Sequence, residues 1–192
     1  MGIFNFLKTY SDSITALSAV VVTGLAVYGV REWKRQLKGK TDYEIARRYL
    51  KATLQMRDAI KFVRNPFVSV GEMRSALKEH GFNSEEYENK DKTNRAVYSI
   101  RWKKVQEAWT NLEAELLEAE VSWGYEAINT QKSLNSLVKE LFAALEIFLS
   151  GFSKFGDENH KLIYDFGDQD EFLPKVNNAI KEIKDFLKPH LE

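Results

Sequence analysis

Residues 13–30 of this chain, SITALSAVVVTGLAVYGV, contain no charged side chain and are rich in valine, alanine and leucine. An apolar run of about 18 residues is long enough to cross the hydrocarbon core of a bilayer as an α-helix. Serine and threonine are tolerated in such a helix because their hydroxyls can bond back to its carbonyls. The run therefore predicts a transmembrane helix, with its basic flank, over residues 13–38. A buried helix in a soluble core is the alternative.

Basic residues gather on one side of this run. Residues 31–48 are dominated by arginine and lysine, whereas only Lys8 precedes the run. Such a flank is typical of a stop-transfer segment and not of a signal-peptide cleavage site. The positive-inside rule then places the N-terminus outside and the C-terminal domain in the cytoplasm. A basic cluster beside a span also attracts anionic lipid headgroups. The candidate lipid contacts are Arg31, Lys34, Arg35, Lys38 and Lys40.

Aromatic and small residues add detail to the expected span. Tyr10 on one side, and Tyr28 with Trp33 on the other, match the aromatic belts at the two membrane interfaces. Residues 1–12 form a short peptide with an apolar face that suits the headgroup region. Small residues repeating every four positions permit close contact between two spans. The candidate face for self-association into a homo-oligomer consists of Thr15, Ala19 and Thr23.

Composition excludes several classes of function. Lysine plus arginine and aspartate plus glutamate each number 28, so the net charge is zero. A balanced chain offers no electrostatic reason to expect nucleic acid as a partner. The chain has no cysteine, which excludes disulfides, cysteine-ligated zinc and thiol catalysis.

Residues 39–192 predict an all-α cytosolic domain, an antiparallel bundle of about four long helices. Apolar residues recur at steps of three and four, which gives each helix one apolar face. These faces must be buried against one another, and an antiparallel bundle is the simplest arrangement. Intermolecular coiled coils are the alternative. The predicted stripes are Ile45, Tyr49, Ala52, Met56, Ile60 and Val63; Tyr98, Trp102, Val105, Trp109, Leu112, Leu116, Ala119 and Trp123; Leu134, Leu137, Leu141, Leu145, Phe148 and Phe152; and Phe172, Val176, Ile180, Ile183 and Leu187.

Caps and breaks set the expected helix boundaries. Thr41 and Glu44 form a capping box, so a helix is predicted to begin there after a break at Gly39, although one glycine does not preclude a continuous helix. That helix should end near residue 64. A short helix over residues 72–80 should stop at Gly81. An exposed polar loop, or the frayed start of a helix, should follow over residues 83–94.

The later boundaries follow from the same signals. Gly124 should interrupt the second long helix, and the third should end near Gly156. Asp170 should cap the last helix, which should end at Pro189.

Charged residues on two of the expected helices are candidates for ion pairs between them. If these helices pack antiparallel, basic residues on one meet acidic residues on the other. The outcome is either a solvated surface or a partly buried network. The residues concerned are Arg57, Lys61 and Arg64 with Asp58 on the first helix, and Glu113, Glu115, Glu118 and Glu120 on the second.

The sequence matches the residue patterns of known catalytic and metal sites only weakly. Arg74 and His80 have the spacing of the arginine and histidine of HEPN ribonucleases, with His80 as general base. No histidine has a glutamate three residues before it, as bundle di-iron sites require. The acidic run at residues 165–171 lacks the ligand spacing of a calcium loop, and is interpreted as a turn and helix cap. The sequence therefore predicts no cofactor and no metal.

Several short motifs carry a family resemblance. They are WKRQL at residues 33–37, GKT at 39–41, RR at 47–48, RDA at 57–59, RNP at 64–66, RWxKV at 101–105 and LLEAExxWG at 116–124. With them the chain resembles an uncharacterised group of bacterial single-pass inner-membrane proteins over roughly residues 15–150. The resemblance implies a bacterial inner-membrane location and supplies no catalytic residue.

The expected function is a non-enzymatic, membrane-anchored interaction or scaffold module with an unknown cytosolic protein partner. Two alternatives remain: an oligomerising effector that perturbs the membrane, as a toxin or defence protein would, and a HEPN-like ribonuclease.

Overall fold

The computed structural model describes residues 2–82, 89–150, 158–164 and 167–192, and within these the side chains of residues 2–17, 19, 20 and 158 are not described. Every regular element in these ranges is a helix, so the predicted all-α class is confirmed. The elements are α1 (Gly2–Arg64), α2 (Val70–Glu79), α3 (Lys90–Trp123), α4 (Tyr125–Leu149), α5 (Glu158–Ile163), the 3-10 turn η2 (Gly167–Gln169) and α6 (Phe172–Leu191).

The chain divides into two compact units, Met1–Tyr43 and Glu44–Glu192. Residues 2–43 of helix α1 belong to the first unit, and residues 44–64 of the same helix are the first helical segment of the second unit. Gly39 lies inside α1, and the Thr41 hydroxyl donates to the carbonyl of Leu37 at 3.0 Å. The predicted capping box at Thr41 is therefore wrong, because a residue inside a helix has its own amide already bonded to the preceding turn.

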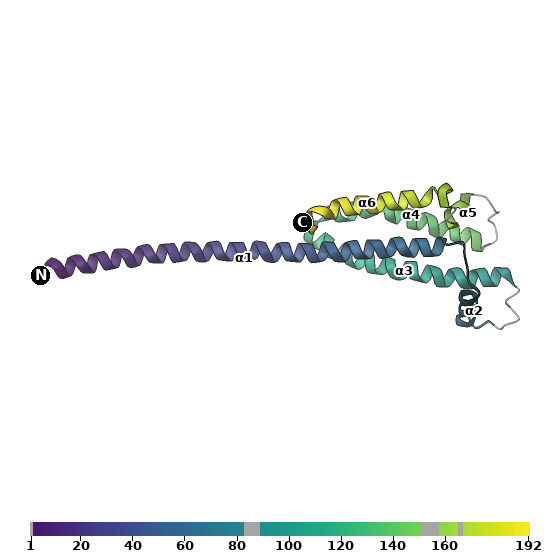
Figure 1. Cartoon of the computed structure of the whole chain (residues 1–192), viewed down its shortest axis with the longest axis horizontal. Coiled ribbons are helices and arrows are strands. Elements are labelled where there is room, and N and C mark those ends of the chain that lie inside the picture. Colours follow the sequence, from purple (N-terminus) through teal and green to yellow (C-terminus); the bar gives the residue numbers. More distant parts are fainter. Residues whose placement is uncertain (1, 83–88, 151–157, 165–166) are drawn as a thin grey trace. The chain divides into compact units, whose positions relative to one another are not determined.

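The second unit is a bundle in which residues 44–64 of α1 lie beside α3, α4 and α6 (Figure 1). Helix α4 packs against α3 and α6, α5 packs against the end of α4, and α2 packs against the N-terminal part of α3. The apolar stripes predicted from the sequence face inward. The stripes on α1 and α6 are buried completely, and those on α3 and α4 are buried or partly buried wherever they are described. Phe152 and Gly156, the predicted end of α4, lie outside the described residues.

The turn between α3 and α4 consists of a single residue. Gly124 has φ +78° and ψ −162°, and its amide donates to the Glu120 carbonyl at 2.7 Å. This backbone conformation is accessible essentially to glycine alone, so the break predicted at Gly124 is confirmed. The reversal sets α3 and α4 side by side in opposite directions (Figure 1).

The remaining helix ends follow the sequence signals closely. Helix α2 begins after Ser69, whose Oγ accepts from the Glu72 amide, and Gly81 follows it with φ +73°. Helix α3 begins at Lys90 with Asn89 as its cap, earlier than its apolar stripe indicates. Residues 90–94 are helical, so the loop interpretation is wrong for them and the alternative of a helix start holds. Residues 83–88 lie outside the described residues.

Helix α6 continues through Pro189 to Leu191. Its predicted end at Pro189 is therefore wrong by two residues. Proline removes one amide donor from a helix, and here that loss falls within the last turn.

Candidate functional site

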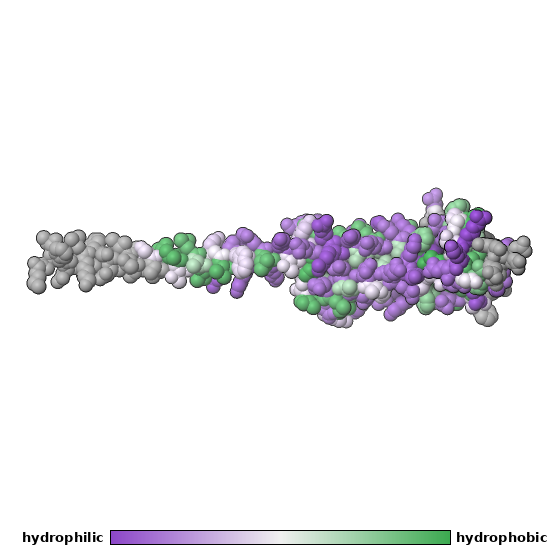
Figure 2. Space-filling view, turned by 90° about the horizontal axis from the view of Figure 1, so that it is seen from below, coloured by the Kyte–Doolittle hydropathy of each residue, from purple (hydrophilic) through white to green (hydrophobic). Residues whose placement is uncertain are grey.

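Unit 1 presents large apolar side chains to its surroundings. Over residues 21–37 they are between 48% and 68% exposed, and Figure 2 shows them at the surface. Successive helical residues turn by about 100°, so Val21, Val22, Val27 and Val30 point to four different sides. A helix that is apolar all round is suited to an apolar surrounding, not to water. The full set is Val21, Val22, Leu25, Val27, Tyr28, Val30, Trp33 and Leu37.

The basic flank follows directly on the same helix. The side chains of Arg31, Lys34, Arg35, Lys38 and Lys40 are all exposed. One of them is paired within the helix, since Arg35 Nη2 lies 2.8 Å from Glu32 Oε1. The others extend into the surroundings, as contacts to lipid headgroups would require.

The structure describes only some of the other residues predicted to act in the first unit. Tyr28 and Trp33 are exposed, as interface anchors must be, and Thr23 is exposed as well. The side chains of Tyr10, Thr15 and Ala19 lie outside the described residues. Within the part of the chain that is described, no helix is long and apolar enough to cross a membrane. The predicted span includes residues 13–17, 19 and 20, whose side chains are not described.

Arg101 on α3 joins the end of α1 to the start of α2. Its Nε and Nη2 donate to the two carboxylate oxygens of Glu72 at 2.6 and 3.0 Å. Its Nη1 donates to the carbonyl of Asn65 at 2.5 Å, and Nη2 also reaches that of Phe67 at 2.7 Å. The hydrogen bonds from Arg101 hold the pKa of Glu72 below its usual value, against the opposing effect of burial.

Arg64, the last residue of α1, makes the corresponding connection to α5 and α6. Its Nε donates to the carbonyl of Leu162 at 2.6 Å, and Nη2 donates to those of Lys161 and Tyr164 at 3.1 and 2.8 Å. Both carboxylate oxygens of Asp170 accept from it at 2.7 Å. The arginine therefore closes the C-terminal end of α5, where carbonyls have no partner within the helix.

Asp170 acts as the cap that the sequence predicts. It accepts from the amides of Phe172 and Leu173 at 3.0 and 3.3 Å, so it satisfies two donors at the start of α6. Burial raises the pKa of Asp170, but the Arg64 guanidinium and these amides outweigh it and leave the pKa below its usual value. The residue is thus a structural ion-pair partner. Asp165, at the start of the acidic run, lies outside the described residues.

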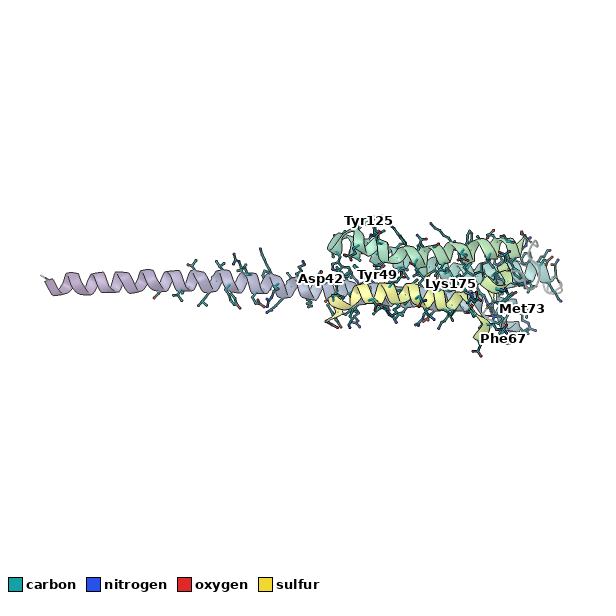
Figure 3. All side chains as sticks on the ribbon, turned by 90° about the horizontal axis from the view of Figure 1, so that it is seen from above. Asp42, Tyr49, Phe67, Met73, Tyr125 and Lys175 are labelled. Carbon is teal, nitrogen blue, oxygen red and sulfur yellow. The ribbon has the colours of Figure 1, made fainter. Side chains whose placement is uncertain are left out.

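A third polar connection ties α1 to α3 and α4. The Tyr49 hydroxyl donates to Gln131 Oε1 at 3.2 Å, and Gln131 Nε2 donates to Glu113 Oε1 at 2.8 Å. Burial raises the pKa of Tyr49 to about 12, so the phenol stays neutral. Tyr49 is labelled on α1 in Figure 3.

The charge pairing differs from the one the sequence suggests. Arg57 pairs with its neighbour Asp58 at 2.8 Å, and Arg64 turns to α6. The acidic residues of α3 are instead met by Arg48, whose guanidinium lies 3.1 Å from Glu115 and 3.7 Å from Glu118. Among the described residues, Arg57 and Arg64 do not pair with the glutamates of α3. The pairs that α1 and α3 do form are partly exposed, as the solvated-surface alternative predicts.

Arg74 lies within α2, and His80 is the C-cap of the same helix. A separation of six residues places two side chains about 120° apart around a helix axis. Arg74 is exposed, whereas His80 Nδ1 lies 2.9 Å from the carbonyl of Ala76 and its ring stacks on Phe82.

The other histidines are held by aromatic rings. His160 lies against Phe148 and Tyr164 at ring-centroid distances of 5.5 and 5.2 Å, and His190 stacks on Trp123 at 4.1 Å. Among the residues that the structure describes, no group of three or more histidines and carboxylates could hold a metal ion.

The sequence patterns did not predict that Arg64 and Arg101 are buried and connect separate helices. Each pairs with a carboxylate distant in the sequence, 29 positions for Arg101 and 106 for Arg64. The sequence indicates this role only for Arg101, which lies next to the apolar stripe of α3. A buried arginine there needs a partner to be stable.

Comparison with known proteins gives no match to a protein family, a curated protein or a solved structure. The resemblance to bacterial single-pass proteins stays a prediction from the sequence.

Proposed function

We propose that this protein is a membrane-anchored interaction module of a bacterial inner membrane. One span within residues 13–38 holds it in the bilayer with the N-terminus outside, and the helical bundle lies on the cytoplasmic side. The module performs no chemistry of its own. It brings a cytosolic protein partner to the membrane surface.

The observation that carries this proposal is the all-round apolar surface of residues 21–30 in unit 1. Leaving several valine, leucine and aromatic side chains in water is unfavourable by about 25 cal/mol for each Å² of apolar surface. The Glu44–Glu192 bundle, in contrast, buries its apolar faces within itself. A lipid surrounding removes the apolar surface of unit 1 from water, and the exposed basic flank meets anionic headgroups there.

An apolar row on the bundle supports contact with a protein partner. Leu117 and Val121 lie one turn apart near the end of α3, and Tyr125 opens α4. They are 62%, 89% and 62% exposed. Exposed apolar patches of this kind mark interaction surfaces more often than isolated exposed residues do.

A matched pair of arginine substitutions tests the anchor. Leu25 is 65% exposed in the first unit, and Leu117 is 62% exposed on the bundle, so neither substitution removes core packing. An arginine at the centre of a span opposes insertion by about 2.5–3.5 kcal/mol, or about a hundredfold in the inserted fraction.

The measurement is the share of full-length protein that stays with carbonate-washed bacterial membranes. We expect Leu25→Arg to lose most of this membrane fraction and Leu117→Arg to keep it. A Leu25→Arg variant that is retained like the parent chain would contradict the anchor, as would a parent chain found in the soluble fraction.

A further inference from the structure

A groove of about 460 Å³ lies between α3 and α4 on the surface of the bundle. Val105 and Val138 are buried and form its floor. Its lining spans residues 102–110 of α3, which is about 12 Å along the helix. The residues that line it are Trp102, Val105, Gln106, Trp109, Thr110, Asn135, Val138, Lys139 and Phe142.

Aromatic rings make up the sides of this groove. The ring centroids of Trp102 and Phe142 lie 5.0 Å apart with planes tilted by 31°. Trp109 lies two turns further along α3 and is only partly buried. Phe142 is 42% exposed, so part of its ring surface remains open to a ligand. Such faces favour stacking with another planar ring.

A lysine at the edge gives the groove its charge. Lys139 lies about one turn from Phe142 on α4, and among the described residues it makes no ion pair or hydrogen bond. The other lysine of α4, Lys132, sits over the Tyr125 ring at 5.3 Å and lies outside the groove. The groove therefore combines open aromatic faces with one unmatched positive charge.

We propose that this groove binds a planar aromatic monoanion, whose ring stacks on Trp102 and Phe142 and whose anionic group pairs with Lys139. The volume falls in the range of small-molecule sites, about 300–1,000 Å³. The proposal is independent of the membrane anchor.

The probe is 2-naphthoate, titrated into the full chain labelled with 5-fluorotryptophan in lipid nanodiscs. The chain has four tryptophans, and ¹⁹F spectra of tryptophan-to-phenylalanine variants assign their signals. We expect the signals of Trp102 and Trp109 to shift to saturation while those of Trp33 and Trp123 stay in place. The neutral analogue 2-naphthamide should bind more weakly.

Three variants test the assigned contacts. Lys139→Met keeps the apolar stem and should weaken naphthoate binding about three- to fivefold, as expected for one exposed ion pair. Phe142→Ala should weaken it about tenfold by removing a stacking surface and its buried area. Lys132→Met, on the same helix but outside the groove, should leave binding unchanged.

Several results would overturn the proposal. One is equal affinity for the acid and the amide, because the charge would then play no part. Another is unchanged binding by Lys139→Met. A third is a shift of the Trp33 signal alone, which would show that the probe enters the bilayer instead of the groove.

Discussion

Arg64 and Arg101 are the two basic side chains that the described part of the bundle removes from water, each only 1% exposed. A buried charge is stable only when it is paired and hydrogen-bonded. Both arginines meet this condition with one carboxylate and several backbone carbonyls, and both act where α1 ends. A helix end leaves carbonyls without partners; Arg101 bonds such carbonyls at the end of α1, and Arg64 bonds those at the end of α5.

Substitution of Arg64 should be strongly destabilising. Arg64→Met removes the charge partner of the Asp170 carboxylate, which is 3% exposed, and removes a hydrogen bond from each of three carbonyls. Breaking a buried pair in this way lowers the free energy of unfolding by about 3–5 kcal/mol. Arg57→Met, which breaks only a surface pair, should change it by less than about 0.5 kcal/mol. Urea unfolding followed by tryptophan fluorescence measures both, and similar midpoints for the two variants would contradict the assignment.

The same pair predicts a loss of stability in acid. The folded chain holds the pKa of Asp170 below its usual value of 3.8. The unfolded chain therefore binds a proton at higher pH than the folded chain does. The stabilisation is present above about pH 4 and is lost as the pH falls through the lower folded value. Asp170→Asn cannot titrate, so its urea midpoint should fall less steeply below about pH 4 than that of the parent. Parallel curves for the two proteins would exclude this role.

The apolar faces of the helices were predictable because each is defined by residues three and four positions apart in the sequence. The stripe from Ile45 to Val63 and that from Phe172 to Leu187 are buried as expected. Local sequence motifs predict a helix boundary wrongly where the chain continues as one helix. Thr41 and Glu44 match a capping box, yet Gly39 does not break the helix, so the box has no helix start to cap. The partners of Arg64 and Arg101 depend on tertiary contacts that no local spacing encodes.

Glycine at the α3–α4 turn is required by its backbone conformation. Gly124→Ala introduces no steric clash, because no atom lies within 4 Å of the added Cβ, but its φ of +78° is strained for alanine. The substitution should lower the free energy of unfolding by about 1–3 kcal/mol. The control is Gly71→Ala in α2, where the added Cβ meets only Ser69 Oγ at 3.9 Å. That substitution should be neutral or stabilising by up to about 1 kcal/mol. Equal effects in urea unfolding would show that the turn tolerates other residues.

At the scale of the whole molecule, exposed apolar side chains and basic residues are distributed unevenly between unit 1 and the bundle. The bundle buries its apolar faces, and the described part of unit 1 exposes apolar side chains and then a basic flank. Net charge is zero for the chain, so the basic excess is local to the flank. Local excess is what the positive-inside rule responds to, since it counts lysine and arginine near the ends of a span and not net charge.

This asymmetry predicts the orientation of the chain. Because the protein has no cysteine, a single introduced cysteine reports its own accessibility. A membrane-impermeant maleimide should label Asn5→Cys in intact bacterial cells. It should label Lys175→Cys, at an exposed position of α6 (Figure 3), only after lysis. Replacing Arg31, Lys34, Arg35 and Lys38 together by glutamine should weaken this preference, because the flank supplies most of the charge difference. Labelling of Lys175→Cys in intact cells would reverse the proposed topology and place the bundle, with any partner, outside the cytoplasm.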